Sequence, residues 1–448
     1  MTRKFNLLRE NLFEWIKNDI IAYKNYYKWL IKFGGISIVK INVGIGFVTG
    51  RKNFKNLLKS YVEDWNESGL VDNKKISLNL FIAYDLNYSK TKISDYNIID
   101  KDILGMVDSI YYISKSAVLA EAQSLVHNKI TSSKEAKLFF GEGYAMKRNT
   151  VLYFAIKSKM DYLIFLDDDE YPVASVKIGN SIMWKGQHVL ATHINNIESA
   201  NMTHGYHCGY ISPIPSIEFN NTLTEADFKV FIEAISNDII SWDSVRARMK
   251  DGGITYADPE ILNREHAVEV KEIGGMKFIS GANLCFNLNS IHEVFPFYNP
   301  PGARGEDTFL STCLKKYTVK KVPCYTFHDG FSNYKHILHG VLPNKLNPIT
   351  ADSTRIVNRF LTATIGWIRY KPLLLFITNR DNYEIEITKM KDNLSNVIPK
   401  ICAYFGNNEF NKILNELELF HRDVKGHFEK FEQTKAAWVK IVSYLKKI

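Results

Sequence analysis

Three consecutive aspartates directly follow an apolar segment, and this arrangement constrains the chain more than any other feature. The segment is YLIFL at 162–166, and Asp167, Asp168 and Asp169 come next. Such an apolar run predicts a buried strand, and ligand sites of open α/β sheets lie at the carboxyl ends of their strands. Packed carboxylates repel one another, so a fold tolerates them beside a cation or in water. The sequence therefore predicts either a site for Mg²⁺ or Mn²⁺, which would also hold diphosphate oxygens, or a solvated acidic loop.

Strand and helix patterns alternate through most of the chain. Residues 36–50 predict a strand ending in a Gly-rich turn, 52–65 a helix, and 75–87 a second strand. This opening is typical of a parallel sheet covered by helices. The later segments are a helical stretch over 101–138, a helix over 148–160, the strand before the aspartates, a β-rich stretch over 181–220, a helical stretch over 222–250, a strand over 278–287, a loop opening a helix over 304–317, and a strand over 319–330.

These patterns divide the chain into three regions. Residues 1–35 predict an amphipathic helical segment, with apolar residues at helical spacing. Residues 36–345 predict an α/β domain. Strand signals fade beyond about residue 345, and we expect residues 346–448 to form a helical C-terminal region.

The charge of the chain limits its possible partners, and its cysteine content limits its possible cellular compartment. The chain has 57 Lys and Arg against 48 Asp and Glu, a formal net charge of +9, but no nucleic-acid motif, so we expect no nucleic-acid partner. The basic C-terminal helices favour either an anionic membrane surface or a plain bundle over the α/β domain. The apolar segment 361–377 contains Arg369 and Lys371 and falls short of the ~20 apolar residues of a spanning helix. Five scattered cysteines and an N-terminus unlike a signal peptide predict a cytoplasmic location, with peripheral binding at the inner face of the plasma membrane as the membrane variant.

The stretch GEGYAMKRNTVLYFAIKSKMDYLIFLDDDEYP resembles the core of GT-A glycosyltransferases, above all the large family two. Asp167 and Asp169 match the D-x-D motif of that fold. The resemblance implies that Asp169 binds a divalent metal and that Asp167 binds the ribose or the metal, with Asp168 also at the donor. Arg148 matches a residue that approaches the nucleotide, and a helix N-terminus there suits anions.

The start of the chain agrees with this resemblance. GFVTGRKNFKNLLKSY is similar to the first strand, turn and helix of the family, and it places Thr49 and Arg51 where the nucleotide is cradled. Asp85 follows the second strand and matches an acid that contacts the base. The alternative for Asp85 is a surface carboxylate in a loop.

A second acidic pair, Glu306 and Asp307, lies in RGEDTFL. This pattern resembles the "ED" motif of inverting GT-A enzymes, which implies Asp307 as the general base, with Glu306 as the fallback; the alternative is a helix cap. FISGANLCFN resembles the segment that lines the sugar pocket, where Gly281 would allow close backbone approach; the alternative is an ordinary strand turn. His328 ends the last strand and matches a late metal ligand of many GT-A enzymes; the alternative is a structural histidine.

The resemblance implies a GT-A fold: a Rossmann-like α/β domain with a mixed, mostly parallel sheet. It implies a metal-dependent transferase that moves one sugar from a nucleotide sugar, with a UDP-sugar as the guess. The acceptor is a glycan or a lipid-linked molecule, in surface polysaccharide or glycoconjugate biosynthesis, and the transfer is inverting. The processive Q-x-x-R-W motif is absent, since GWIRY at 366–370 does not match it.

Four alternatives stay open at this point. A retaining enzyme would need no base at Asp307. A sugar-phosphate transferase of capsule synthesis also has acidic strand ends. A D-x-D-x-[TV] phosphatase would need Thr or Val where Tyr171 stands. The fourth alternative is a carbohydrate-binding scaffold without catalysis, on a degenerate GT-A fold.

Overall fold

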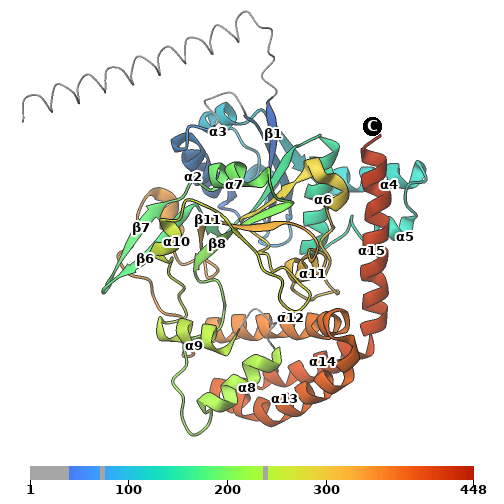
Figure 1. The fold of residues 1–448 in the computed structure, drawn as a ribbon. Helices are drawn as coiled ribbons and strands as arrows, with labels where there is room; N and C mark the ends of the chain where they lie inside the picture. Colours follow the sequence, from blue (N-terminus) through green and yellow to red (C-terminus); the bar gives the residue numbers. More distant parts are fainter. Residues whose placement is uncertain (1–39, 71–75, 236–240, 448) are drawn as a thin grey trace, which may run out of the picture. The chain divides into compact units, whose positions relative to one another are not determined.

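The strand predicted before the three aspartates is β4, Tyr162–Asp167, and its first five residues are buried. It pairs in parallel with β1, Ile41–Thr49, with Val48 opposite Asp167. The computed structural model describes residues 40–70, 76–235 and 241–447, and the described residues from Asn42 onward form one compact unit (Figure 1). The predicted amphipathic helix at 1–35 lies outside the described residues.

Within the described residues, β4 and β1 belong to a nine-stranded mixed sheet of order β3-β2-β1-β4-β10-β8-β11-β5, with β9 beside β11. The pairs β2–β3, β1–β4 and β8–β11 are parallel, whereas β10 runs antiparallel to β4 and to β8. The other strands are β2 (Ile76–Tyr84), β3 (Ser109–Ile113), β5 (Glu170–Tyr171), β8 (Met202–Gly209), β9 (Val268–Glu269), β10 (Leu284–Asn287) and β11 (Val319–His328).

Helices cover both faces of this sheet, which explains why its central strands are apolar throughout. On one face, Phe47 of β1 meets Phe54 of helix α2, Phe54–Glu67, at a ring-centroid distance of 5.1 Å. On the other face, Val48 belongs to a core with residues of α6, Tyr144–Lys157. Strands buried on both faces read as continuous apolar runs, which is the pattern of β1, β2 and β4.

The other α-helices before residue 345 are α3 (Lys101–Met106), α4 (Lys115–His127), α5 (Ser133–Ala136), α7 (Val189–Ile197), α8 (Glu225–Ile235), α9 (Trp242–Lys250), α10 (Pro259–Leu262) and α11 (Glu306–Thr312). Strands β6, Val173–Ile178, and β7, Ser181–Gly186, form a separate antiparallel hairpin.

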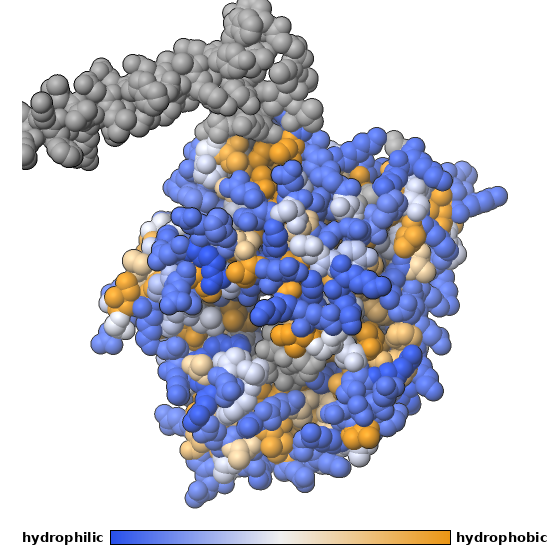
Figure 2. Space-filling view, viewed as in Figure 1, coloured by the Kyte–Doolittle hydropathy of each residue, from blue (hydrophilic) through white to orange (hydrophobic). Residues whose placement is uncertain are grey.

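The C-terminal region is helical, as predicted. It consists of α12 (Thr354–Thr378), α13 (Tyr383–Phe405), α14 (Lys412–Arg422) and α15 (Val424–Leu445). These helices share one apolar core with α8 and α9. By length and composition α12 could cross a bilayer, but 67% of its most apolar window is buried within the protein, as in the central helix of a bundle. On the face drawn in Figure 2, hydrophilic residues predominate and hydrophobic ones form small scattered groups.

The fold class predicted from the sequence is confirmed: an α/β chain with a mixed sheet, flanking helices and a helical C-terminal region. Two segments differ from the predicted pattern. Residues 101–138 contain strand β3 as well as helices, and residues 181–220 contain helix α7 between two strands. Strand β3 lies at the sheet edge and only its last residue, Ile113, is buried, so its sequence, SIYYI, does not carry the longer apolar run of a central strand.

Candidate active site

The carboxyl ends of β1, β2 and β4 meet at one edge of the sheet. Because Val48 pairs with Asp167, the turn after β1 lies beside the three aspartates. The backbone N–H of Asp85, just beyond β2, donates to the carbonyl oxygen of Thr49 at 2.8 Å. A cleft of about 680 Å³ opens there, and most of the predicted site residues line it: Thr49, Arg51, Asp85, Asp167, Asp168, Asp169, Glu306, Asp307 and His328.

Arg51 joins the turn after β1 to two of the aspartates. Its Nε donates to Asp168 at 2.9 Å, and its Nη2 donates to Asp169 at 2.7 Å. The Thr49 hydroxyl donates to the other Asp168 oxygen at 2.8 Å. Burial raises the pKa of Asp168 to about 6, against the opposing effect of Arg51. Asp168 therefore holds the turn after β1 in place through its hydrogen bonds to Thr49 and Arg51.

Asp169 faces His328 across the cleft floor, with an oxygen of Asp169 3.6 Å from Nε2 of His328. The Nδ1 atom of His328 lies 2.6 Å from the carbonyl oxygen of Tyr210, which can only accept, so Nδ1 carries a proton. The Nε2 position is thus directed at a carboxylate. Burial lowers the pKa of His328, but Asp169 outweighs it and raises the value to about 9.

Asp169 and His328 are the side chains that could hold a divalent cation, which would replace the proton on Nε2 of His328 and compete with Arg51 for Asp169. A histidine that donates one ring N–H to a backbone carbonyl and points its other nitrogen at a carboxylate has the orientation of a metal-binding imidazole. Across the described part of the chain, no three His, Cys, Asp or Glu side chains gather as a complete metal site. Mg²⁺ is commonly held by one or two protein ligands together with waters and substrate phosphates, so a two-residue site suits a cation that arrives with a diphosphate.

Arg148 lies beneath the cleft rather than in its lining. Its side chain is 2% exposed, and its Nη2 donates to Asp167 at 2.9 Å. On its other side, its Nε lies 3.7 Å from Glu306, and its Nη1 donates to the carbonyl oxygen of Gly281. Gly281 therefore sits behind Arg148, where a Cβ would lie 3.3 Å from the guanidinium. Both residues were predicted to bind the donor, and both lie one layer below the cleft surface.

Glu306 and Asp307 form the first turn of α11 and line the cleft opposite β1. One Asp307 oxygen accepts from the backbone N–H of Thr308 at 2.8 Å, and Asp307 makes no ion pair within the described residues. Burial and the neighbouring Asp307 raise the pKa of Glu306 to about 7. Gly305, directly before them, has φ +85°, and a Cβ there would lie 3.0 Å from the ring of Tyr370 on α12.

A second cavity of about 360 Å³ adjoins the cleft, because Asp85 and Lys147 line both. Its walls are mainly apolar and come from the end of β2, the start of α4 and the loop before α6, and Lys147 forms an ion pair with Asp85. The sequence singled out Asp85 and missed Lys147, although Lys147 directly precedes Arg148. It also missed the residues at the start of α6, before α11 and on α12 that complete the cleft: Tyr144, Arg304, Arg359, Trp367 and Tyr370.

No family model matches the chain, and no curated protein matches it. Among solved structures, one match is the apo form of mouse xyloside xylosyltransferase 1, with 12% sequence identity and a TM-score of 0.20. The match covers 40% of this chain and 55% of that chain, so it spans about half of the xylosyltransferase's length. A similarity this low carries no argument about function.

Proposed function

We propose that this protein is a metal-dependent glycosyltransferase that moves one sugar from a nucleotide-sugar donor to an acceptor hydroxyl. One observation carries the proposal: two acidic groups, Asp167–Asp169 and Glu306–Asp307, line one cleft, and a mainly apolar cavity adjoins it. The first group suits a cation with a diphosphate, and the second suits proton removal. The adjoining cavity has the size and the mainly apolar lining of a pocket for a small planar ring.

The donor would extend from the apolar cavity into the cleft. Its base would lie near Asp85 and Lys147, which the two spaces share. Its diphosphate would reach Asp169 and His328, and its sugar would then point towards α11. The metal, Mn²⁺ or Mg²⁺, would be held by Asp169 and His328 and would neutralise the negative charge of the leaving diphosphate.

On this proposal Asp307 is the general base. Both acids line the cleft, but Glu306 lies 3.7 Å from Nε of Arg148, whereas Asp307 makes no ion pair within the described residues. Asp307 accepts the proton of the acceptor hydroxyl while that oxygen forms a bond to the anomeric carbon. The bond from the anomeric carbon to the diphosphate oxygen breaks, and the nucleoside diphosphate leaves with the electron pair. Attack opposite the leaving group inverts the anomeric centre.

The wider setting follows from the same proposal. A UDP-sugar is the first donor to test. We propose a glycan or lipid-linked acceptor and a cytoplasmic location. We also propose that the enzyme contacts the inner face of the plasma membrane, because a chain with a formal net charge of +9 is attracted to anionic lipid. The matching pathway class is surface polysaccharide or glycoconjugate biosynthesis.

The decisive experiment measures nucleoside diphosphate release from a panel of sugar nucleotides, with Mn²⁺, with Mg²⁺ and with EDTA. We expect release from at least one donor with metal and none with EDTA. Asp392→Asn is the matched control, because Asp392 is exposed on α13 and no described residue of that helix lines the cleft. Binding of a sugar nucleotide without any turnover, with or without added saccharides, would favour a non-catalytic scaffold and reject the proposal.

A further inference from the structure

Two arginine side chains that line the cleft make no ion pair or hydrogen bond within the described residues, although Asp169 is near enough to Arg359 to act on its charge. They are Arg304, in the loop before α11, and Arg359, on α12. The other cations of the lining, Arg51 and Lys147, are paired with aspartates. The proposed sugar transfer leaves Arg304 and Arg359 without a role.

Packing against α12 fixes the direction in which the Arg304 side chain points. Its backbone N–H donates to the carbonyl oxygen of Gly366 at 3.2 Å. A Cβ at Gly366 would lie 2.8 Å from Cγ of Arg304, so the arginine stem crosses the helix where it has no side chain. The absence of a side chain at Gly366 thus leaves room for Arg304 to lie along α12 and reach the cleft.

Arg359 is held in a comparable way. Its guanidinium carbon lies 4.9 Å from the ring centroid of Phe331. Its Nη2 would lie 3.0 Å from a Cβ at Gly330, two residues after the end of β11. Burial lowers the pKa of Arg359; Asp169 opposes this, and Arg304 and Arg51 add to it by repulsion. The two arginines therefore come from different elements, are placed by packing, and repel each other.

We propose that Arg304 and Arg359 form an oxyanion-binding site on the α12 side of the cleft, and that the site takes a phosphate group. Guanidinium groups stay charged and present planar pairs of donors that match phosphate oxygens. Arg304 is exposed and Arg359 is half-buried, and two like charges that share one cleft repel each other until an anion joins them. A bound phosphate offsets that repulsion and accepts hydrogen bonds from the guanidinium N–H groups of both arginines, which make none within the described residues.

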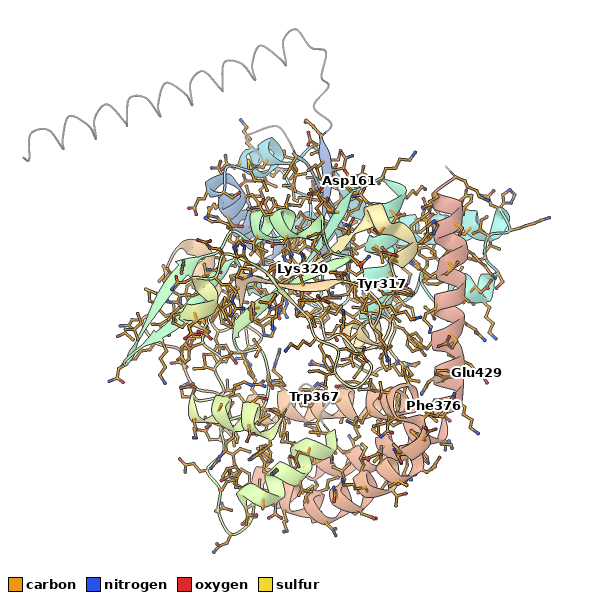
Figure 3. All side chains as sticks on the ribbon, in the orientation of Figure 1. Asp161, Tyr317, Lys320, Trp367, Phe376 and Glu429 are labelled. Carbon is orange, nitrogen blue, oxygen red and sulfur yellow. The ribbon has the colours of Figure 1, made fainter. Side chains whose placement is uncertain are left out.

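The surroundings indicate that the phosphate belongs to a sugar-containing ligand. Trp367, which Figure 3 labels on α12, is half-buried and lines the same cleft as the two arginines. An aromatic face beside donors for an anion suits a sugar ring that carries the anion. The phosphate has two sources within this chemistry: the diphosphate of the donor, or a phosphate on the acceptor.

The test compares wild type with Arg304→Gln, Arg359→Gln and the double variant, and uses Lys389→Gln as control. Lys389 is exposed on α13 and makes no ion pair within the described residues. Its replacement by Gln therefore lowers the net charge by the same amount as each single arginine variant without breaking an ion pair. Inorganic phosphate, glucose 6-phosphate, glucose and UDP with Mn²⁺ are titrated by calorimetry. Circular dichroism and thermal unfolding confirm folding of each variant, and Arg359→Lys replaces any variant that fails to fold.

We expect wild type and Lys389→Gln to bind phosphate and glucose 6-phosphate alike, and the arginine variants to bind both at least about tenfold more weakly. If the donor supplies the phosphate, UDP binding weakens in the same variants and bound UDP excludes phosphate. If the acceptor supplies it, UDP binding is unchanged and glucose 6-phosphate binds in the presence of UDP. Equal phosphate affinity in wild type and in the double variant, or no binding to wild type at millimolar phosphate, would overturn the proposal. Since these titrations involve no turnover, failure of the proposed sugar transfer leaves their outcome interpretable.

Discussion

His328 and Asp169 come from opposite halves of the α/β domain, yet Nε2 of His328 lies 3.6 Å from a carboxylate oxygen of Asp169. The two residues meet because β5 and β11 pair antiparallel, with His328 opposite Glu170. The last strand of the sheet thereby brings its terminal side chain to the aspartates that follow β4. Two of the predicted metal ligands are therefore neighbours in space.

The first prediction concerns this pair. In His328→Gln and in Asp169→Asn, Mn²⁺ should no longer raise the melting temperature in the presence of UDP, because each change removes one of two ligands. Thermal unfolding with UDP, with and without Mn²⁺, measures this effect. Asp392→Asn should keep the full shift. An undiminished shift in both cleft variants would place the metal elsewhere.

The second prediction concerns the general base. Asp307→Asn should lower kcat by about 10²–10⁴-fold while the affinity for the nucleotide sugar stays near that of wild type. The amide keeps the oxygen that accepts from Thr308 and removes the proton acceptor. Steady-state kinetics paired with donor titration separate the two effects. Wild-type turnover in this variant would exclude Asp307 as the base.

The third prediction uses the buried guanidinium of Arg148. Arg148→Met should destabilise the protein by about 3–5 kcal/mol, because it leaves Asp167 and Glu306 without their shared cation beneath the cleft. Urea unfolding measures the loss. Arg246→Met is the control, since Arg246 pairs with Glu225 at the exposed surface and should cost below about 1 kcal/mol. Similar losses in both variants would contradict a special role for Arg148.

The fourth prediction concerns pH and Asp64, which lies on α2 away from the cleft lining. Burial raises the pKa of Asp64 to about 8, and one of its oxygens has no hydrogen-bond partner. The folded protein therefore keeps a proton on Asp64 at pH values at which the unfolded chain has already released it, because the pKa of Asp64 in the unfolded chain is near its ordinary value. Stability should fall as pH rises from about 4 to about 8.

Asp64→Asn should remove this component of the pH dependence and raise the free energy of unfolding by about 1–3 kcal/mol at pH 8.5–9, with little change near pH 4. Urea unfolding at several pH values provides the measurement. Parallel stability curves for wild type and Asp64→Asn would show that Asp64 is ionised and stabilised in the folded protein.

The sequence predicted the parts of the site that depend on strand ends. Apolar runs mark buried strands, and parallel strands bring the residues after them to one edge, so Thr49, Asp85 and Asp167 could be grouped from the sequence. Arg148 is different: its place below the cleft depends on Phe165, Phe297 and Gly281 packing around it. Such three-dimensional packing has no periodic signal in the sequence.

The C-terminal side of the cleft could not be predicted for a related reason. Arg359 and Trp367 lie on a helix that follows the last strand of the sheet, and nothing in their local sequence indicates that the helix returns to the strand ends. Only the pairing of apolar faces in the bundle places α12 there. The helical nature of this region was predictable from its composition, whereas its contribution to the cleft depends on tertiary contacts.

The contact between Tyr370 and Gly305 has a practical consequence for dissecting this protein. A chain shortened ahead of Thr354 would retain every aspartate that follows β4, but the loop before Glu306 would lose the ring that covers it and the Arg369 bond to the Gly302 carbonyl. The acidic pair would then stand on an unsupported segment at an open, water-filled edge. A truncated sheet portion is for that reason an unsuitable minimal version of the protein, and activity assays need the helices in place.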